Sequence, residues 1–93
     1  MRLRYAEQAL LEIDNAMQWY ENQVKGLELT FLDCVEETIR LILANPVLYP
    51  IKHKKFRGAQ ISKFPFTIFY VVHQTEIIIY SVFDNRRNPA KRP

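Results

Sequence analysis

The sequence predicts an α+β fold, in which a hairpin of two helices packs on a small twisted antiparallel sheet in the order β-α-α-β-β-β. Apolar residues recur every three or four positions through residues 6–43, which is the spacing of one helix face. After Pro50, β-branched and aromatic residues dominate between turn-forming residues, as is typical of strands. Since the chain has 93 residues, we expect one domain that spans residues 1–93.

The N-terminal half contains the signals for a strand and two helices. Residues 2–5 alternate basic with apolar side chains, which predicts a short strand. An apolar stripe from Ala6 to Val24 predicts the first helix, and Gly26 can adopt the left-handed conformation that ends a helix. The second helix is expected to start at Leu27 and to stop at Asn45, because the following proline disfavours a helical residue before it.

The C-terminal half is predicted to supply the rest of the sheet. Three strands are expected, over residues 60–63, 66–73 and 76–83. Gln74 and Thr75 are expected to form the tight turn between the last two strands.

Both faces of the predicted sheet are apolar. A two-helix hairpin covers one face of a small sheet, so we expect Phe69, Val71, and Ile77 or Ile79, to be partly uncovered and available to a partner. The alternative is that the sheet curls and the C-terminal tail folds back across it.

Charge is distributed unevenly along the chain, although its net value is only +3. Residues 1–45 hold four basic against eight acidic residues, whereas residues 46–93 hold nine against two. A basic C-terminal half indicates an acidic partner, either nucleic acid or an anionic protein segment. Arg57, Lys63, Arg86 and Arg87 are the candidate contact residues in this half, unless these charges serve solubility alone.

Several kinds of site and location are disfavoured by the sequence. The longest stretches without charge are too short to cross a bilayer, and acidic residues near the N-terminus argue against a secretory signal, so we expect a cytoplasmic protein. His53 and His73 lie 20 positions apart without nearby Cys or acidic clusters, which makes a poor metal site. No metal or cofactor is therefore expected.

Three residues of the predicted helical hairpin are expected to have structural roles. Cys34 has no cysteine partner and lies on an apolar helix stripe, which predicts a core thiol. Trp19 and Tyr20 are expected to anchor the hairpin on the sheet.

Three segments together resemble a known family. The first holds Trp19-Tyr20-Glu21, Gly26-Leu27 and Phe31-Leu32, the second holds Arg57, Phe64-Pro65-Phe66, Ile68 and Tyr70, and the third holds the strand over residues 77–83 followed by Arg86-Arg87-Asn88-Pro89. In this order and at this spacing, the chain resembles a ParE-type member of the RelE/ParE toxin superfamily.

The resemblance implies a fold, a partner and two possible targets. It implies a helical hairpin on a twisted antiparallel sheet, and a cognate antitoxin, ParD-like or similar, whose helix and extended segment wrap the toxin. ParE-like relatives poison DNA gyrase, whereas RelE-like relatives cut mRNA in the ribosome.

These two targets require different chemistry. Metal-independent RNA cleavage needs a base, an acid and cations for the charged phosphorane. The cations could come from Lys52, Lys54, Arg57 and Arg86, but the tail after Arg86 lacks the Tyr or His that ribonuclease relatives commonly carry there. We therefore predict a noncatalytic gyrase toxin. The alternatives are a ribosome-dependent mRNA endoribonuclease and a relative that binds antitoxin without being toxic.

Overall fold

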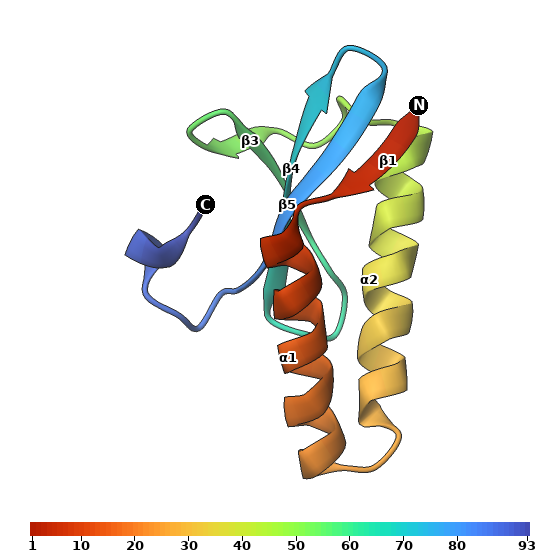
Figure 1. Ribbon diagram of the computed structural model, residues 1–93, viewed down its shortest axis with the longest axis vertical. Helices are drawn as coiled ribbons and strands as arrows, with labels where there is room; N and C mark the ends of the chain where they lie inside the picture. The colour runs from red at the N-terminus through yellow and green to blue at the C-terminus, as the bar shows by residue number, and fades with distance from the viewer.

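The computed structural model describes residues 1–93 and confirms an α+β fold of two helices packed on one five-stranded sheet (Figure 1). The strand order across the sheet is β1-β5-β4-β3-β2. In chain order, the elements are β1 (Arg2–Tyr5), α1 (Glu7–Gln23), α2 (Leu27–Ala44), β2 (Ile51–His53), β3 (Phe56–Gln60), β4 (Phe66–His73), β5 (Glu76–Asp84) and the short 3-10 helix η1 (Pro89–Lys91).

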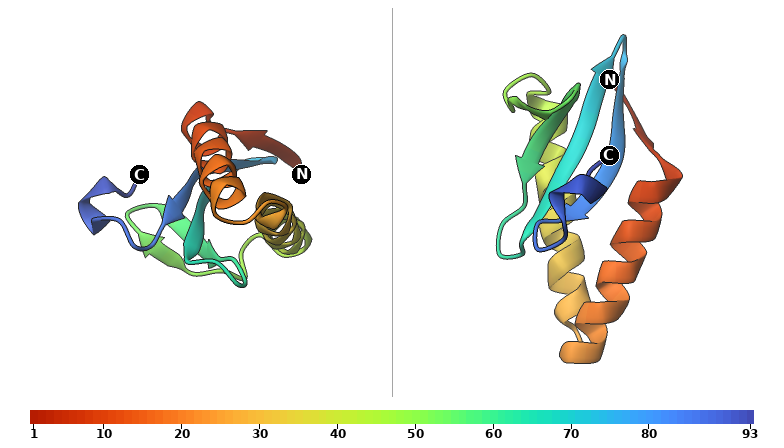
Figure 2. Two further views of the ribbon diagram at one scale, coloured as in Figure 1. Left: turned by 90° about the horizontal axis from the view of Figure 1, so that it is seen from below. Right: turned by 90° about the vertical axis from the view of Figure 1, so that its left-hand side faces the viewer.

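The helical hairpin forms where the sequence predicts it. Gly26 has φ +96°, which is the left-handed conformation that lets the chain reverse between the helices. Its amide donates a hydrogen bond of 2.8 Å to the Glu28 carboxylate, so the turn is also stabilised from the first turn of α2. Figure 2 shows the two helices side by side along one side of the sheet. Neither is long and apolar enough to cross a membrane.

The sheet is mixed, so the prediction of an antiparallel sheet is wrong for one strand pair. β1 runs parallel to β5, with Leu3 opposite Ile77, while the other neighbouring strands are antiparallel. Residues 6–75, which include both helices and three strands, connect β1 to β5, and a long connection of this kind permits parallel pairing.

The predicted strand over residues 60–63 is also wrong. The strand in this region is β3, which ends at Gln60, and a further short strand, β2, precedes it. Lys63 has φ +70°, and the Ile61 amide donates to the Phe66 carbonyl at 3.1 Å. Residues 61–65 therefore form a tight connection between β3 and β4. The predicted bounds of β4 are confirmed, and β5 extends one residue further than predicted.

The main core lies between the helices and the sheet. Its aromatic centre brings Tyr20 of α1 and Phe31 of α2 against Phe64 and Phe66, with ring centroids 4.9 to 6.3 Å apart. Cys34 is buried in the same core, which confirms its predicted structural role.

A second, smaller core covers the other face of the sheet. It consists of Phe56, Phe69 and Phe83, and Val71 and Tyr80 pack against it. The twisted strand β3 brings Phe56 to within 5.2 Å of the Tyr80 ring, so aromatic side chains of the sheet itself shield this face.

The expectation of a partly uncovered apolar face is therefore wrong for Phe69, Ile77 and Ile79. Phe69 is buried in the second core, and the two isoleucines are fully buried beneath the helices. The register shifts between Phe69 and Tyr70, which leaves an extra residue in β5 and reverses the alternation of its side chains. Only Val71 stays half-buried.

Candidate functional site

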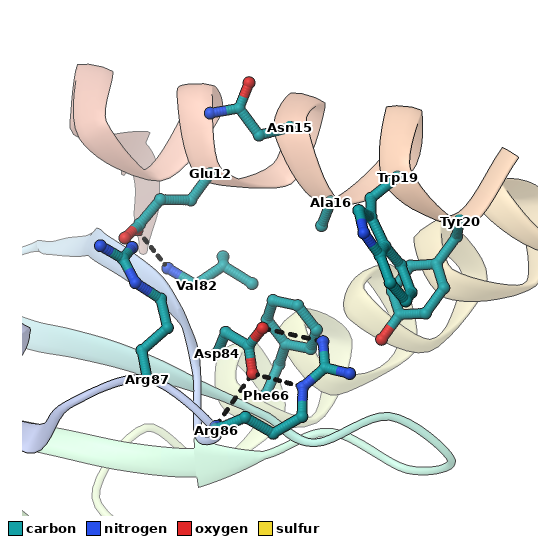
Figure 3. A pocket seen from close by; sticks show the side chains of 10 residues that line it. All are labelled: Glu12, Asn15, Ala16, Trp19, Tyr20, Phe66, Val82, Asp84, Arg86 and Arg87. Atoms are coloured by element: carbon teal, nitrogen blue, oxygen red, sulfur yellow. Dashed lines mark hydrogen bonds and ion pairs between the residues drawn. The ribbon is translucent and has the colours of Figure 1, made fainter. Parts of the chain in front are cut away.

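A pocket of about 330 Å³ lies between α1 and the C-terminal end of β5 (Figure 3). One wall comes from α1 and the other from the end of β5 and the residues that follow it. The lining residues are Glu12, Asn15, Ala16, Trp19, Tyr20, Phe66, Val82, Asp84, Arg86 and Arg87. The pocket therefore combines an apolar floor with two carboxylates and two guanidinium groups.

Glu12 connects the two walls of this pocket. Its Oε1 accepts a hydrogen bond of 2.8 Å from the Ser81 hydroxyl and one of 3.0 Å from the Val82 amide. The bulge in β5 brings this part of the strand to α1, so that the carboxylate reaches both donors. Since both donors belong to β5, Glu12 fixes the helix relative to the strand.

Arg86 is held by Asp84. The Arg86 Nε and Nη2 atoms donate to the two carboxylate oxygens at 2.9 and 2.8 Å, and the Arg86 amide donates to the same group at 2.9 Å. The hydrogen bonds from Arg86 lower the pKa of Asp84, and the pKa of Arg86 is raised in return. Both groups are therefore charged at neutral pH, and each compensates the other.

The Arg86 guanidinium also stacks on Trp19, 5.5 Å from the centre of the indole ring. Trp19 was expected to anchor the hairpin on the sheet, but its side chain is half exposed and contacts Arg86, which follows β5. The expectation is right for Tyr20, which is buried and packs edge-on against Trp19. Burial raises the pKa of Tyr20, although the nearby Arg86 opposes this shift.

Arg87 is the basic side chain of the pocket that forms no ion pair. Its side chain lines the cavity (Figure 3) and belongs to neither of the two ion pairs in the structure. It is exposed, as is Lys63 in the turn before β4.

The remaining predicted cations lie elsewhere. Lys52 and Lys54 are exposed on the hairpin of β2 and β3, at the left of Figure 1. The Arg57 guanidinium donates to the carbonyls of Val47 and Tyr49, at 3.3 and 2.7 Å. The guanidinium of Arg57 is therefore engaged by hydrogen bonds to the loop after α2.

The four residues considered for RNA cleavage do not converge on one point. Arg57 pairs with Tyr70 in the middle of β4, whereas Asp84, which holds Arg86, pairs with Phe66, the first residue of that strand. Four residues of extended chain separate these two positions, which is about 13 Å.

The two histidines lie in different surroundings. His53 is half-buried with its ring 6.2 Å from that of Phe69, and His73 is exposed at the end of β4. The structure has no group of three or more His, Cys, Asp or Glu side chains that could hold a metal ion.

Arg86 and Arg87 were predicted from the sequence, whereas Glu12 and Asp84 were not, and Trp19 was expected to have only a structural role. Two signals were available. Glu12 is an acidic residue between Leu11 and Ile13 on a helix whose apolar face is buried, and Asp84 lies two residues before Arg86, a spacing that permits a local ion pair.

Comparisons with known proteins agree with this architecture. Residues 3–89 match the family model described as ParE toxin of type II toxin-antitoxin system, parDE. Nine chains of solved structures match the fold. One comes from the chromosomal ParDE toxin-antitoxin system from P. aeruginosa, with a TM-score of 0.78 and 19% sequence identity. The similarity covers 90% of this chain and 95% of that one. No curated protein matches by sequence.

Proposed function

Because the chain belongs to the ParE toxin family of type II toxin-antitoxin systems, we propose that it inhibits DNA gyrase in the cytoplasm without catalysing a reaction and that a cognate antitoxin neutralises it. Every member of the family shares this fold, so the fold alone does not distinguish a binding mechanism from a catalytic one. The choice of a binding mechanism rests on the positions of the basic side chains in this chain.

The proposal rests on the separation of Arg86 from the three cations of the β2–β3 hairpin. Cleavage of an RNA backbone requires several positive charges around one phosphate, as the attacking oxygen and the leaving oxygen both carry charge. Here the Arg86 charge is compensated by Asp84, and Arg57 is bound to backbone carbonyls. This arrangement supports a protein that acts by binding, and it gives the ribonuclease alternative little support.

The pocket beside α1 is the proposed contact site for the antitoxin. It offers the half-exposed Trp19 to an apolar side chain, and Arg87 to a carboxylate. Glu12, and the stacking of Arg86 on Trp19, join the two walls, so the pocket is preformed. An extended acidic segment with one aliphatic or aromatic anchor fits this chemistry.

Co-expression tests the antitoxin site. The chain should co-purify with the small protein encoded beside it, and Arg87→Glu combined with Trp19→Ala should reduce the affinity at least tenfold. Arg92→Glu is the matched charge control, since Arg92 lies beyond η1 and does not line the pocket. Equal loss with the control would contradict the site.

A supercoiling assay tests the target. Purified gyrase should lose supercoiling activity and accumulate cleaved DNA when the chain is added, while mRNA on translating ribosomes should stay intact. Cleaved mRNA together with unaffected gyrase would contradict the proposal and favour the ribonuclease.

A further inference from the structure

The loop between α2 and β2, together with the first residue of β2, exposes three large aliphatic side chains. Val47, Leu48 and Ile51 have 63%, 66% and 59% of their surface exposed. Single exposed apolar residues are ordinary, but three within five positions are not. We name Val47, Leu48 and Ile51 the apolar loop surface.

The backbone of this loop is held firmly by the sheet. The carbonyl of Pro46 accepts a hydrogen bond of 2.6 Å from the Tyr70 hydroxyl, and the carbonyl of Pro50 accepts one of 3.1 Å from the Gly58 amide. Arg57 donates to the two carbonyls between them, those of residues 47 and 49. Four of the five carbonyls from residue 46 to residue 50 are thus bound.

The hydrogen-bonded backbone of this loop favours the binding of a partner. A mobile loop could turn its aliphatic side chains inward, whereas a loop bound at four carbonyls holds the apolar loop surface in water. A backbone that is already fixed loses little conformational entropy when a partner covers the side chains that it carries. The apolar loop surface is therefore preorganised for a contact.

The charged residues around the loop indicate which chemical groups a partner must present. No acidic residue occurs from position 38 to position 75, a segment that holds six basic ones. Lys52, Lys54 and Lys55 follow the apolar loop surface directly and form no ion pair. A partner that meets this region must bring acidic groups.

The aliphatic character of the surface favours a protein over a nucleic acid. Nucleic acids are bound through cations and through aromatic side chains that stack on bases, whereas branched aliphatic side chains fit apolar pockets of proteins. The surface also lies apart from the pocket beside α1. Tyr70, which holds the loop, and Phe66, which lines the pocket, are four residues apart on β4, which is about 13 Å.

We infer that the apolar loop surface and the adjacent lysines are the docking surface for the toxin's target, and that the target presents an apolar pocket with an acidic rim. This inference rests on the proposed toxin function and adds the residues that contact the target. Antitoxin and target would then use separate surfaces of the toxin.

The test compares two matched double variants. Val47→Ser with Leu48→Ser removes the centre of the apolar loop surface without touching the carbonyls that hold the loop. Val24→Ser with Leu29→Ser is the control, because these residues have 61% and 59% exposure at the far tip of the helical hairpin. Growth arrest on induction, gyrase supercoiling, antitoxin capture, sedimentation and the thermal midpoint are measured for both.

The loop variant should abolish growth arrest and lower potency against gyrase at least tenfold, which corresponds to about 1.4 kcal/mol of binding free energy. Its thermal midpoint and antitoxin capture should equal those of the control. Full toxicity of the loop variant would overturn the inference. Selective loss of antitoxin capture, of self-association or of RNA cleavage in place of target inhibition would overturn it as well.

Failure of the proposed target can be distinguished from failure of the inference. If the wild-type chain arrests growth but leaves gyrase active, gyrase is the wrong target. Relief of that arrest by the loop variant alone would still support the docking surface. A wild-type chain that does not arrest growth would overturn both.

Discussion

The Tyr70 hydroxyl donates a hydrogen bond of 2.6 Å to the carbonyl of Pro46, which joins the middle of the sheet to the loop that follows α2. Tyr70 is fully buried, and its burial raises the pKa of the phenol. The bond satisfies a donor that has no access to water.

Replacing Tyr70 with Phe should destabilise the protein by about 1 kcal/mol, because the Pro46 carbonyl loses its partner while the ring still fills the core. Chemical denaturation measures the loss. Limited proteolysis should show faster cleavage within residues 46–50, and an unchanged cleavage pattern would contradict the role of Tyr70 in holding the loop.

The same variant should change how stability depends on alkaline pH. Since the folded pKa of Tyr70 lies above 10.0, its contribution is fully present below pH 10 and is lost as the pH rises through the folded pKa. Wild type should therefore lose its advantage over Tyr70→Phe above pH 10. A constant difference in the free energy of unfolding across this range would contradict the assignment.

Glu12 offers a matched pair of substitutions. Glu12→Ala removes the acceptor for the Ser81 hydroxyl and the Val82 amide, and it should cost about 2 kcal/mol because Ser81 is almost fully buried. Glu12→Gln retains an acceptor oxygen and should cost less than half of that. Equal losses in urea denaturation would show that the carboxylate does not join α1 to β5.

Arg86→Gln should lower stability at neutral pH by about 0.5 kcal/mol, a small value because the Arg86 side chain is half exposed. Asp84 has a lowered pKa, so its contribution is present above pH 3.8 and is lost as the pH falls through the folded pKa. The difference between the thermal midpoints of wild type and variant should therefore shrink below pH 3.8, where only the stacking of Arg86 on Trp19 remains. An undiminished difference in strong acid would contradict the pairing.

Gly26→Ala should destabilise the helical hairpin by about 1 kcal/mol. The added methyl group meets no atom within 4 Å, so the cost comes only from placing an L side chain at φ +96°. Lys25→Ala is the control at the neighbouring position, which has no positive φ. Similar thermal midpoints for the two variants would contradict this explanation.

The helices were predictable because each signal is local. The apolar stripe, the reversal at Gly26 and the stop before Pro46 all appear within one or two turns of sequence. Strand β4 was equally predictable, because its β-branched residues and the turn that follows it are adjacent in the sequence.

The sheet was predicted wrongly where its structure depends on pairing between residues that are far apart in the sequence. One extra residue in β5 reverses the side-chain alternation, and nothing in the local pattern marks it, so Ile77 and Ile79 were assigned to the wrong surroundings. The parallel pairing of β1 is likewise set by a strand more than 70 positions away. The pocket depends on the same packing, which brings Trp19 to Arg86.

Whether the chain acts on gyrase by binding is tested by titrating the wild-type chain against a fixed amount of gyrase, beside the same titration in a translating ribosome extract. A toxin that acts by binding should inhibit supercoiling in proportion to the fraction of gyrase it occupies, and it should leave mRNA intact at every ratio. Cleavage of many mRNA molecules by each toxin molecule, with gyrase activity unchanged at saturating toxin, would instead identify the chain as a ribonuclease.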